Sequence, residues 1–223
     1  MAVEAVIWDF GGVFTTSPFE AFNRFEAARG LPPDFIRKIN AADADANAWA
    51  LFERAEIDAA GFDAKFLKES TALGWPVRGA DVLPLISGEV RPAMVEALKI
   101  CKARFKVGCI TNNMVQGRGP SMAATPERAH RAADIMAIFD AVIESSKAGV
   151  RKPDPRIYQM MCELLGVEAK ACVYLDDLGV NCKPAAQLGM KAIKVVSEAQ
   201  ALDDLERATG LVFPRSSLAA TRS

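Results

Sequence analysis

The 223-residue chain is long enough to bury a substantial hydrophobic core, and it fits one large domain or one domain with a smaller insertion. Its residues are 51% hydrophobic and 25% charged, which is ordinary for a soluble globular protein. The formal net charge of −1 argues against a surface that binds nucleic acid or an anionic membrane, because such surfaces carry a basic excess.

The cysteines and the N-terminal segment indicate the compartment. Five cysteines are scattered without a CxxC pair, at positions 101, 109, 162, 172 and 182. This pattern is typical of reduced cytosolic thiols rather than of disulfides or a zinc site. No signal-peptide pattern opens the chain, and the longest apolar runs are too short to span a bilayer. We therefore expect a soluble, cytoplasmic protein, and no feature of the sequence indicates an oligomeric state.

The chain opens with a predicted strand at Val6–Trp8. This run has the side chains of a strand buried on both faces, and it stops at Asp9, which Gly11 and Gly12 follow. Asp9 is thus expected at the carboxyl end of a strand, which is the edge where open α/β sheets bind ligands. Taken alone, Asp9 could equally cap the next loop or helix. The later strands decide between these interpretations.

A helical segment is expected next. Phe19, Phe22 and Phe25 have helical spacing over residues 18–29. Residues 34–88 indicate several further helices, rich in alanine and aromatic side chains and without β-branched alternation. We expect a small helical unit inserted after the first strand.

From Arg91 onward, predicted strands alternate with predicted helices. Further strands are expected at Phe105–Thr111, Ala141–Glu144, Cys172–Leu175 and Lys191–Val196. Helices are expected over residues 92–104, 126–136, 156–165, 181–188 and 199–209. Loops are expected over 117–125 and 145–155, and a flexible tail over 214–223. This alternation predicts a three-layer, Rossmann-like α/β fold, with a parallel sheet of about five strands and helices on both faces.

Chemically useful side chains stand at the ends of these strands. Thr111 ends the second strand, and Asp176 and Asp177 follow the fourth. Lys152 lies in the loop after the third strand. Because the carboxyl ends of parallel strands meet at one edge, we expect these side chains to share a pocket with Asp9.

These residue types suit phosphoryl transfer. Three carboxylates repel one another unless a cation lies among them, and oxygen ligands without His or Cys suit Mg²⁺ best. Lys152 adds positive charge, and Thr111 can hydrogen-bond phosphoryl oxygens. Asp9 is then a nucleophile that forms an aspartyl-phosphate, which water cleaves. The residues predict a Mg²⁺-dependent phosphomonoesterase acting on a small phosphorylated substrate.

Four segments resemble the motifs of the haloacid dehalogenase (HAD) superfamily: Asp9–Val13, Ile110–Asn112, Lys152–Pro155 and Tyr174–Asp177. Residues 139–190 are most similar to the phosphatase-like N-terminal domain of mammalian soluble epoxide hydrolase and its bacterial relatives. The resemblance covers nearly the whole chain and leaves no room for an epoxide-hydrolysing domain. It implies a HAD-like core over residues 1–15 and 89–213. Residues 16–88 would form a helical cap that closes over the pocket and selects the substrate.

The resemblance also implies a role for each site residue. Asp9 would be the nucleophile, and Thr111, Asn112 and Lys152 would bind the phosphoryl group, with Lys152 also balancing charge. The implied ligands of Mg²⁺ are Asp9, the backbone carbonyl of Gly11, Asp177 and, directly or through water, Asp176.

Gly11 departs from the superfamily pattern. A second Asp usually occupies this position, protonates the leaving group and then activates water; such an acid/base is worth about 10²–10⁴ in rate. One hypothesis is an activated leaving group, as in a sugar 1-phosphate or an acyl phosphate. Another is a substitute donor, either a water or Glu53 or Glu56 of the cap. A third is a protein that binds phosphorylated ligands with little or no turnover. Dehalogenation fits poorly with the metal site expected at Asp176-Asp177.

Other residues have simpler interpretations. His130 is the only histidine, and its helix predicts a solvated side chain rather than a catalytic base. Three arginines could guide an anion but are more typical of a charged helix face: Arg118, Arg128 and Arg131. Trp49 and Phe52 could line a substrate pocket, although their spacing is typical of helix packing.

Overall fold

A parallel sheet forms the centre of the molecule. The computed structural model describes residues 2–113 and 126–215. Within these residues, five strands form one sheet in the order β3-β2-β1-β4-β5, and all neighbouring strands are parallel. The strands are β1 (Ala5–Trp8), β2 (Lys106–Thr111), β3 (Ala141–Glu144), β4 (Cys172–Asp176) and β5 (Lys191–Lys194). The predicted α/β class is confirmed, and each strand lies within two residues of its predicted bounds.

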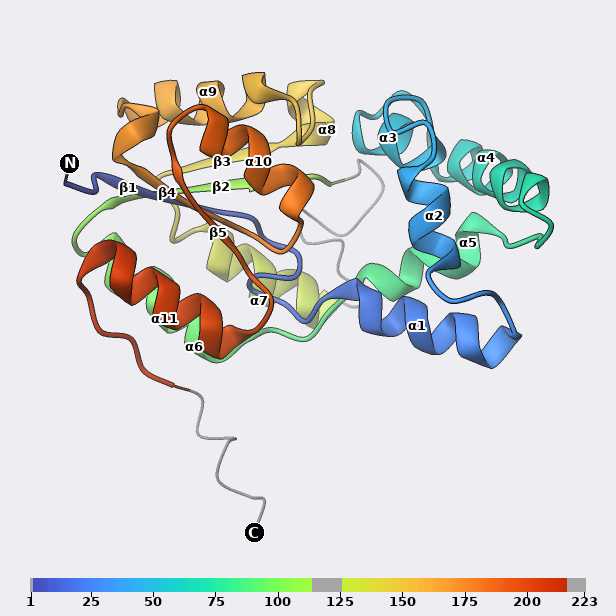
Figure 1. The fold of residues 1–223 in the computed structure, drawn as a ribbon, viewed down its shortest axis with the longest axis horizontal. Helices are drawn as coiled ribbons and strands as arrows, with labels where there is room; N and C mark the ends of the chain where they lie inside the picture. Colours follow the sequence, from blue (N-terminus) through green and yellow to red (C-terminus); the bar gives the residue numbers. More distant parts are fainter. Residues whose placement is uncertain (1, 114–125, 216–223) are drawn as a thin grey trace, which may run out of the picture.

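Helices cover both faces of this sheet (Figure 1). One face packs against α6 (Pro92–Lys102), α7 (Pro126–Met136) and α11 (Glu198–Thr209). The other packs against α9 (Pro155–Leu165) and α10 (Gly179–Gln187). In β1, Val6 and Trp8 belong to the first core, and Ala5 and Ile7 to the second, as the alternation of a strand requires. Within the predicted loop 145–155, the chain forms a short helix, α8 (Ser145–Ala148), and η2 (Ala169–Ala171) precedes β4.

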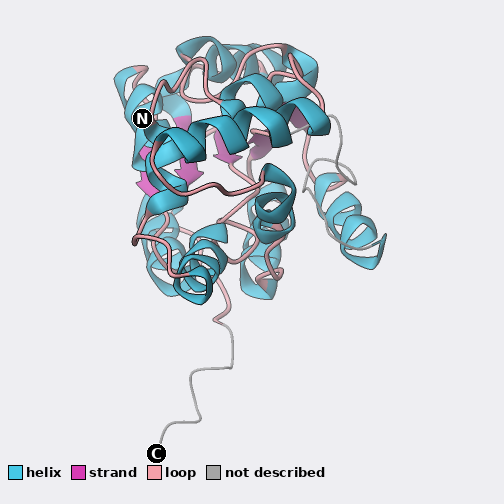
Figure 2. Cartoon of the chain, turned by 90° about the vertical axis from the view of Figure 1, so that its right-hand side faces the viewer, coloured by secondary structure: helices cyan, strands magenta, loops and turns pink. Residues whose placement is uncertain are grey.

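A separate group of helices lies beyond the carboxyl edge of the sheet (Figures 1 and 2). It comprises α1 (Pro18–Arg29), α2 (Phe35–Ala41), α3 (Ala48–Glu53), α4 (Ala59–Ala72), α5 (Gly79–Val82) and η1 (Leu83–Ile86). We call residues 18–86 the helical unit. It has its own core, in which the rings of Trp49, Phe52 and Phe66 lie with centroids 4.8–6.4 Å from partner rings in a cluster around Phe62.

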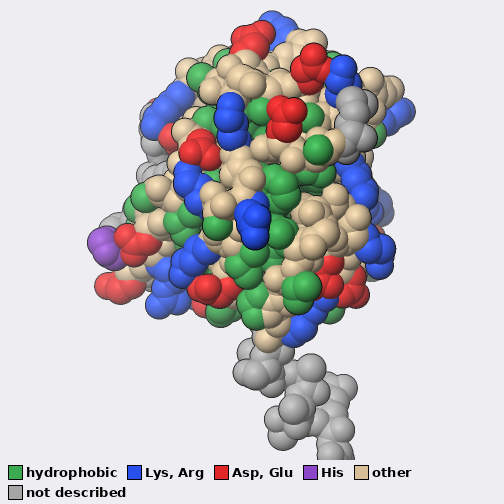
Figure 3. Space-filling model, turned by 90° about the vertical axis from the view of Figure 1, so that its left-hand side faces the viewer, with side chains coloured by type: hydrophobic (Ala, Val, Ile, Leu, Met, Phe, Trp, Pro, Cys, Tyr) green, Lys and Arg blue, Asp and Glu red, His purple; other side chains and the backbone are tan. Residues whose placement is uncertain are grey.

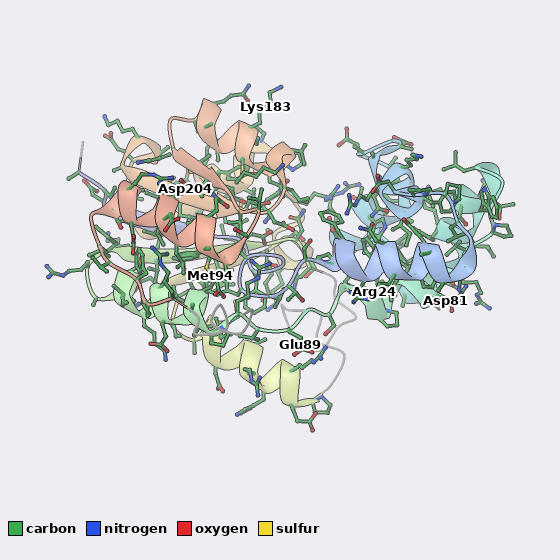
Figure 4. All side chains as sticks on the ribbon, turned by 60° about the horizontal axis from the view of Figure 1, so that its bottom comes forward. Arg24, Asp81, Glu89, Met94, Lys183 and Asp204 are labelled. Atoms are coloured by element: carbon green, nitrogen blue, oxygen red, sulfur yellow. The ribbon has the colours of Figure 1, made fainter. Side chains whose placement is uncertain are left out.

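The chain enters and leaves the helical unit through two paired segments. Thr15 and Val90 form an antiparallel bridge, and the amide of Thr16 donates to the carbonyl of Glu89 at 2.8 Å. A Cβ at Gly88 would lie 2.3 Å from the carbonyl oxygen of Thr16, so this close approach requires glycine. Figure 4 labels Glu89 between the two parts, with Arg24 and Asp81 on the helical unit.

The opposite end of the sheet has a different character. The face in Figure 3 carries lysine and arginine among acidic and apolar side chains, without a region of one charge. A shallow hollow of about 520 Å³ opens at this end, lined in part by Lys102, Lys106 and Asp140. Lys102 pairs with Asp140 at 2.5 Å, and Lys106 donates to the carbonyl of Leu165 at 2.6 Å. Among the described residues, no helix is long and apolar enough to cross a membrane.

Candidate active site

The carboxyl edge of the sheet brings the predicted site residues together. The central strand β1 pairs with both β2 and β4, so Trp8 lies level with Cys109 and Leu175. Asp9 and Asp176, each one residue further, therefore emerge beside each other. Ligand atoms of Asp9, Asp176 and Asp177 all lie within 4.8 Å of one another. This is the cluster that the pattern of strand ends predicts.

Lys152 lies between two of these carboxylates. Its Nζ is 2.8 Å from Oδ1 of Asp9 and 2.8 Å from Oδ2 of Asp176, and its side chain is 1% exposed. Burial alone would lower the pKa of Lys152, but the charges of Asp176 and Asp9 outweigh it and raise the pKa above its usual value. Lys152 is thus a permanent cation within the cluster.

Asp176 is held by protein donors on both oxygens. Its Oδ1 accepts from the amide of Leu178 at 2.8 Å, and its Oδ2 accepts from the hydroxyl of Tyr174 at 2.6 Å. Nδ2 of Asn181 lies 3.1 Å from both oxygens, and Lys152 completes the set. With these partners, the oxygens have few lone pairs left for a metal ion. Asp176 is therefore arranged to fix Lys152, and a contact to a metal through water suits it better than direct ligation.

Asp177 has the opposite surroundings. Among the side chains that the structure describes, only Ser17 donates to its carboxylate, from Oγ over a long 3.4 Å. Burial, followed by the charge of Asp176, raises the pKa of Asp177 to about 6. A Cβ at Gly12, where φ is +72°, would lie 2.1 Å from Oδ2 of Asp177, so this carboxylate packs against bare backbone. Asp177 is thus open to a cation in a way that Asp176 is not.

The two carboxylate oxygens of Asp9 differ in their contacts with the described residues. Oδ1 accepts from the amide of Phe10 at 2.6 Å and from Lys152, whereas Oδ2 accepts no hydrogen bond from any residue that the structure describes. Burial raises the pKa of Asp9 well above its usual value. The charge of Lys152 opposes this effect, and the charges of Asp176 and Asp177 add to it. Oδ2 is the oxygen available to an incoming ligand.

The charges of the cluster suit a divalent cation. Among the described residues, three clustered carboxylates face one buried ammonium, so the fully ionised group carries two excess negative charges. A raised carboxyl pKa is the expected result when no cation offsets this repulsion. The candidate metal-ligand atoms of these side chains are all carboxylate oxygens, which are hard ligands and favour Mg²⁺ over softer metals.

The second and third strands supply the groups beside this cluster. Thr111 is buried at the end of β2. Its neighbour Asn112 holds the peptide of Lys152 from both sides: Oδ1 accepts from the Lys152 amide at 2.9 Å, and Nδ2 donates to its carbonyl at 3.1 Å. Asn112 therefore fixes the backbone of the buried lysine, a function that the sequence analysis did not predict.

The two glutamates considered as proton donors have different positions. Oε2 of Glu53 lies 2.6 Å from a guanidinium nitrogen of Arg151 and 3.3 Å from Nδ2 of Asn112. Burial raises the pKa of Glu53, although Arg151 opposes this effect. The Glu56 carboxylate is half exposed and pairs with Arg54 instead. Only Glu53 reaches the loops of the sheet edge among these two.

The remaining predicted residues lie away from the cluster. The side chain of His130 is 84% exposed on α7, as expected for a solvated residue. Arg128 pairs with Glu89, Arg131 is exposed, and Arg118 lies outside the described residues. Trp49 and Phe52 pack in the aromatic cluster of the helical unit. All five cysteines are buried and free.

Four residues of the site were not identified from the sequence: Ser17, Arg151, Tyr174 and Asn181. Tyr174 carried one usable signal, a hydroxyl in an otherwise apolar strand, which in a buried position requires a partner. The other three are polar residues in predicted loops or near predicted helix starts, where nothing in the sequence separates a site residue from a solvated one.

Comparison with known proteins identifies the family. A family model described as haloacid dehalogenase-like hydrolase matches residues 3–189. The mouse bifunctional epoxide hydrolase 2 is 28% identical over 230 residues, which is 98% of this chain and 41% of that protein. Phosphatase MT3486 of Mycobacterium tuberculosis is 33% identical over 119 residues, 53% of this chain and 50% of that protein.

A solved structure shares the fold. It is a HAD family enzyme from Bacteroides thetaiotaomicron in complex with magnesium and inorganic phosphate, with a TM-score of 0.57 and 16% identity, covering 88% of this chain and 96% of that chain. The present chain spans between about a fifth and a half of the length of the curated relatives it matches. With a family model matched over most of its length, the chain belongs to the haloacid dehalogenase-like hydrolases.

Proposed function

We propose that this hydrolase is a Mg²⁺-dependent phosphomonoesterase that acts through an aspartyl-phosphate at Asp9. The observation that carries the proposal is the arrangement of the Asp9 carboxylate: Oδ1 contacts Lys152, whereas Oδ2 accepts no hydrogen bond from the described part of the chain. Such a carboxylate oxygen, beside a fixed cation, suits nucleophilic attack on an anionic phosphorus centre. A relative named as a phosphatase and a structural neighbour that binds magnesium and phosphate support it.

The donor set fits Mg²⁺. Asp9, Asp177 and the carbonyl of Gly11 would hold the ion, and Asp176 would face it through water. When bound, the ion supplies charge neutralisation for the carboxylates and the phosphoryl oxygens. Lys152, Thr111 and Asn112 would bind and orient the phosphoryl group.

The reaction has two steps. Oδ2 of Asp9 forms a bond to phosphorus while the bond to the leaving oxygen breaks, and the leaving oxygen takes up a proton from water. A water molecule then attacks phosphorus and loses a proton to the solvent, the bond to Oδ2 breaks, and the products are phosphate and the original carboxylate. The helical unit would act as the cap that closes over the pocket and selects the substrate, which we propose is a small phosphorylated metabolite.

Gly11 limits the choice of substrate. It carries no acid, and a Cβ built there meets no heavy atom within 4 Å among the described residues. An activated leaving group, such as that of a sugar 1-phosphate or an acyl phosphate, needs less protonation and is the substrate class that we favour. The same observation favours one competing function, a protein that binds phosphorylated ligands with little or no turnover.

The test is metal-dependent phosphate release from an aryl phosphate. We expect release that EDTA stops, and a fall of at least about 10³-fold in kcat for Asp9→Asn. Asp134→Asn, at an exposed position on α7, is the matched control and should retain full activity. No metal-dependent release across activated and unactivated phosphate esters would reject the enzyme.

A companion variant separates the enzyme from the binding protein. Because Gly11 faces open space, Gly11→Asp should be accommodated without backbone movement. If only the acid/base is missing, kcat for poor leaving groups should rise by about 10²-fold or more, whereas that for activated esters should change little. A variant that folds, binds phosphate and still fails to turn over would favour the binding protein.

A further inference from the structure

Glu53 lies where the helical unit meets the loops at the carboxyl edge of the sheet. It is the last residue of α3, and three separate core segments contact it. Its carboxylate pairs with Arg151 at 2.6 Å and accepts from Asn112 at 3.3 Å. Its carbonyl accepts from Oγ of Ser145 at 2.8 Å. One residue of the helical unit thus contacts the segments that follow β2, β3 and α8.

The core residues that Glu53 contacts are tied to the candidate phosphoryl-binding groups. Asn112 follows Thr111 directly, and its amide holds the Lys152 peptide at 2.9 and 3.1 Å. Arg151 immediately precedes Lys152. Oγ of Ser145 accepts from the amide of Asn113 at 3.0 Å. Glu53 therefore contacts both Arg151, the residue before Lys152, and Asn112, which holds the Lys152 peptide.

The energetics of this contact suit a reversible attachment. The side chains of Arg151 and Glu53 are 21% and 15% exposed, so pairing removes most of their surface from water. The cost of desolvating two charges offsets much of their attraction, which makes such a pair specific in geometry but modest in net stability. Arg151 also donates to the carbonyl of Ala44 at 3.2 Å, while its buried Nε has no partner among the described residues.

We propose that Glu53 is a positioning residue that couples the closed position of the helical unit to the phosphate-binding segments. Ligand that orders Asn112 and Lys152 stabilises the contacts that hold α3, and closure of α3 in turn stabilises the bound ligand. The coupling rests on the proposed function in one respect, because it takes the phosphoryl group as the ligand of this edge.

The test uses inorganic phosphate with Mg²⁺ as the probe and hydrogen exchange as the readout. In the wild type, we expect the amides of α3 to exchange about tenfold more slowly with the probe than without it. In Glu53→Ala, this ligand-dependent protection should fall below about twofold. The matched control is Glu56→Ala, three residues away, half exposed and paired with Arg54. It should keep the full protection.

Kinetics provide a second readout that a merely structural role would not reproduce. For an aryl phosphate, Glu53→Ala should raise KM about tenfold and change kcat by less than about threefold, whereas Glu56→Ala should change neither. Glu53→Gln keeps an acceptor for Asn112 and loses the charge that faces Arg151, so its KM should lie between those of the wild type and Glu53→Ala. Should Glu53→Ala fail to fold, Arg151→Ala removes the same pair from the core side.

The outcomes separate the two proposals. If the wild type shows no ligand-dependent protection of α3, or Glu53→Ala retains it, the coupling is overturned even if phosphate release is observed. If phosphate release is absent but the protection is present and depends on Glu53, the coupling stands and the phosphomonoesterase is rejected.

Discussion

The residues at the carboxyl edge of the sheet and those in the core of the helical unit make different kinds of contact. At the edge, Lys152, Asp9 and Asp176 are buried charges joined at 2.8 Å, and each contact depends on direction. In the helical unit, Phe62 packs against a set of aromatic rings without any polar contact within the cluster. Directional contacts fix atoms within fractions of an ångström, as chemistry requires. Apolar packing is less directional and tolerates changes of side-chain shape that keep the volume.

The first prediction concerns the loss of the buried cation at the sheet edge. Lys152→Met leaves Asp9 and Asp176 buried without their shared cation, so we expect a loss of about 3–5 kcal/mol in the free energy of unfolding in EDTA. Urea denaturation at neutral pH measures this loss. Lys147→Met is the control, because Lys147 is 76% exposed and, within residues 2–113 and 126–215, pairs with Glu144 alone. Its change should stay below about 0.5 kcal/mol. Equal losses for both variants would show that the edge is no more dependent on charge than the surface.

The second prediction concerns a cavity in the core of the helical unit. Phe62 is fully buried, and Phe62→Ala should destabilise the unit by about 3 kcal/mol through the cavity that it leaves. Hydrogen exchange should show the loss in α3 and α4 while the strands keep their protection. Leu73→Ala, at a position 50% exposed, should cost less than about 0.5 kcal/mol. If the strands lose protection together with the helices, the two regions unfold as one and the distinction fails.

The sequence predicted the sheet edge well because the rule that places it is topological. Once strands and helices alternate, Asp9, Thr111 and Asp176 must meet at one edge, whatever the details of packing. The roles of these residues in catalysis stay predictions. The departure at Gly11 needs no topology, because its position is counted from Asp9 along the chain.

What escaped the sequence depends on contacts between distant segments. The different surroundings of Asp176 and Asp177 follow from the side chains of Tyr174 in β4 and Asn181 in α10. Both donate to the carboxylate of Asp176. The contact of Glu53 with Arg151 and Asn112 depends on how the helical unit packs against the core, and no local sequence pattern encodes that packing. Helix α8 was missed because a single turn of four residues leaves almost no periodicity to detect.

The third prediction sharpens the contrast between the two neighbouring acids. The pKa of Asp177 is raised to about 6 by burial and by Asp176, so the folded protein binds this proton more tightly than the unfolded chain does. The resulting penalty is absent well below the usual pKa of 3.8, is still small near pH 4, grows as the pH rises toward 6 and is complete above it. Asp177→Asn should therefore stabilise the metal-free protein by about 3 kcal/mol at pH 7.5 and by less than about 1 kcal/mol near pH 4.

Thermal unfolding with and without Mg²⁺ measures this prediction. Mg²⁺ should stabilise the wild type and have little effect on Asp177→Asn, because the variant has lost an ionised ligand. Asp134→Asn, whose position is 67% exposed, should show neither the gain above pH 6 nor a changed response to Mg²⁺. A gain that is equal at both pH values would contradict the pKa as its cause.

The last prediction concerns the contact that joins the two regions at Asp177. Oγ of Ser17 accepts from the amide of Phe19 at 3.5 Å at the start of α1, and it donates to Asp177 at 3.4 Å. Ser17→Ala should cost about 0.5–1 kcal/mol as the loss of a helix cap. Ser197 caps α11 in the same way, with its Oγ accepting from the amide of Gln200 at 3.2 Å, so Ser197→Ala should cost a similar amount. Only Ser17→Ala should also raise the pKa of Asp177, since that hydrogen bond favours the charged carboxylate, and so weaken the stabilisation by Mg²⁺ at pH 6. An identical response of the two variants to Mg²⁺ would mean that α1 is capped beside the cluster without being coupled to it.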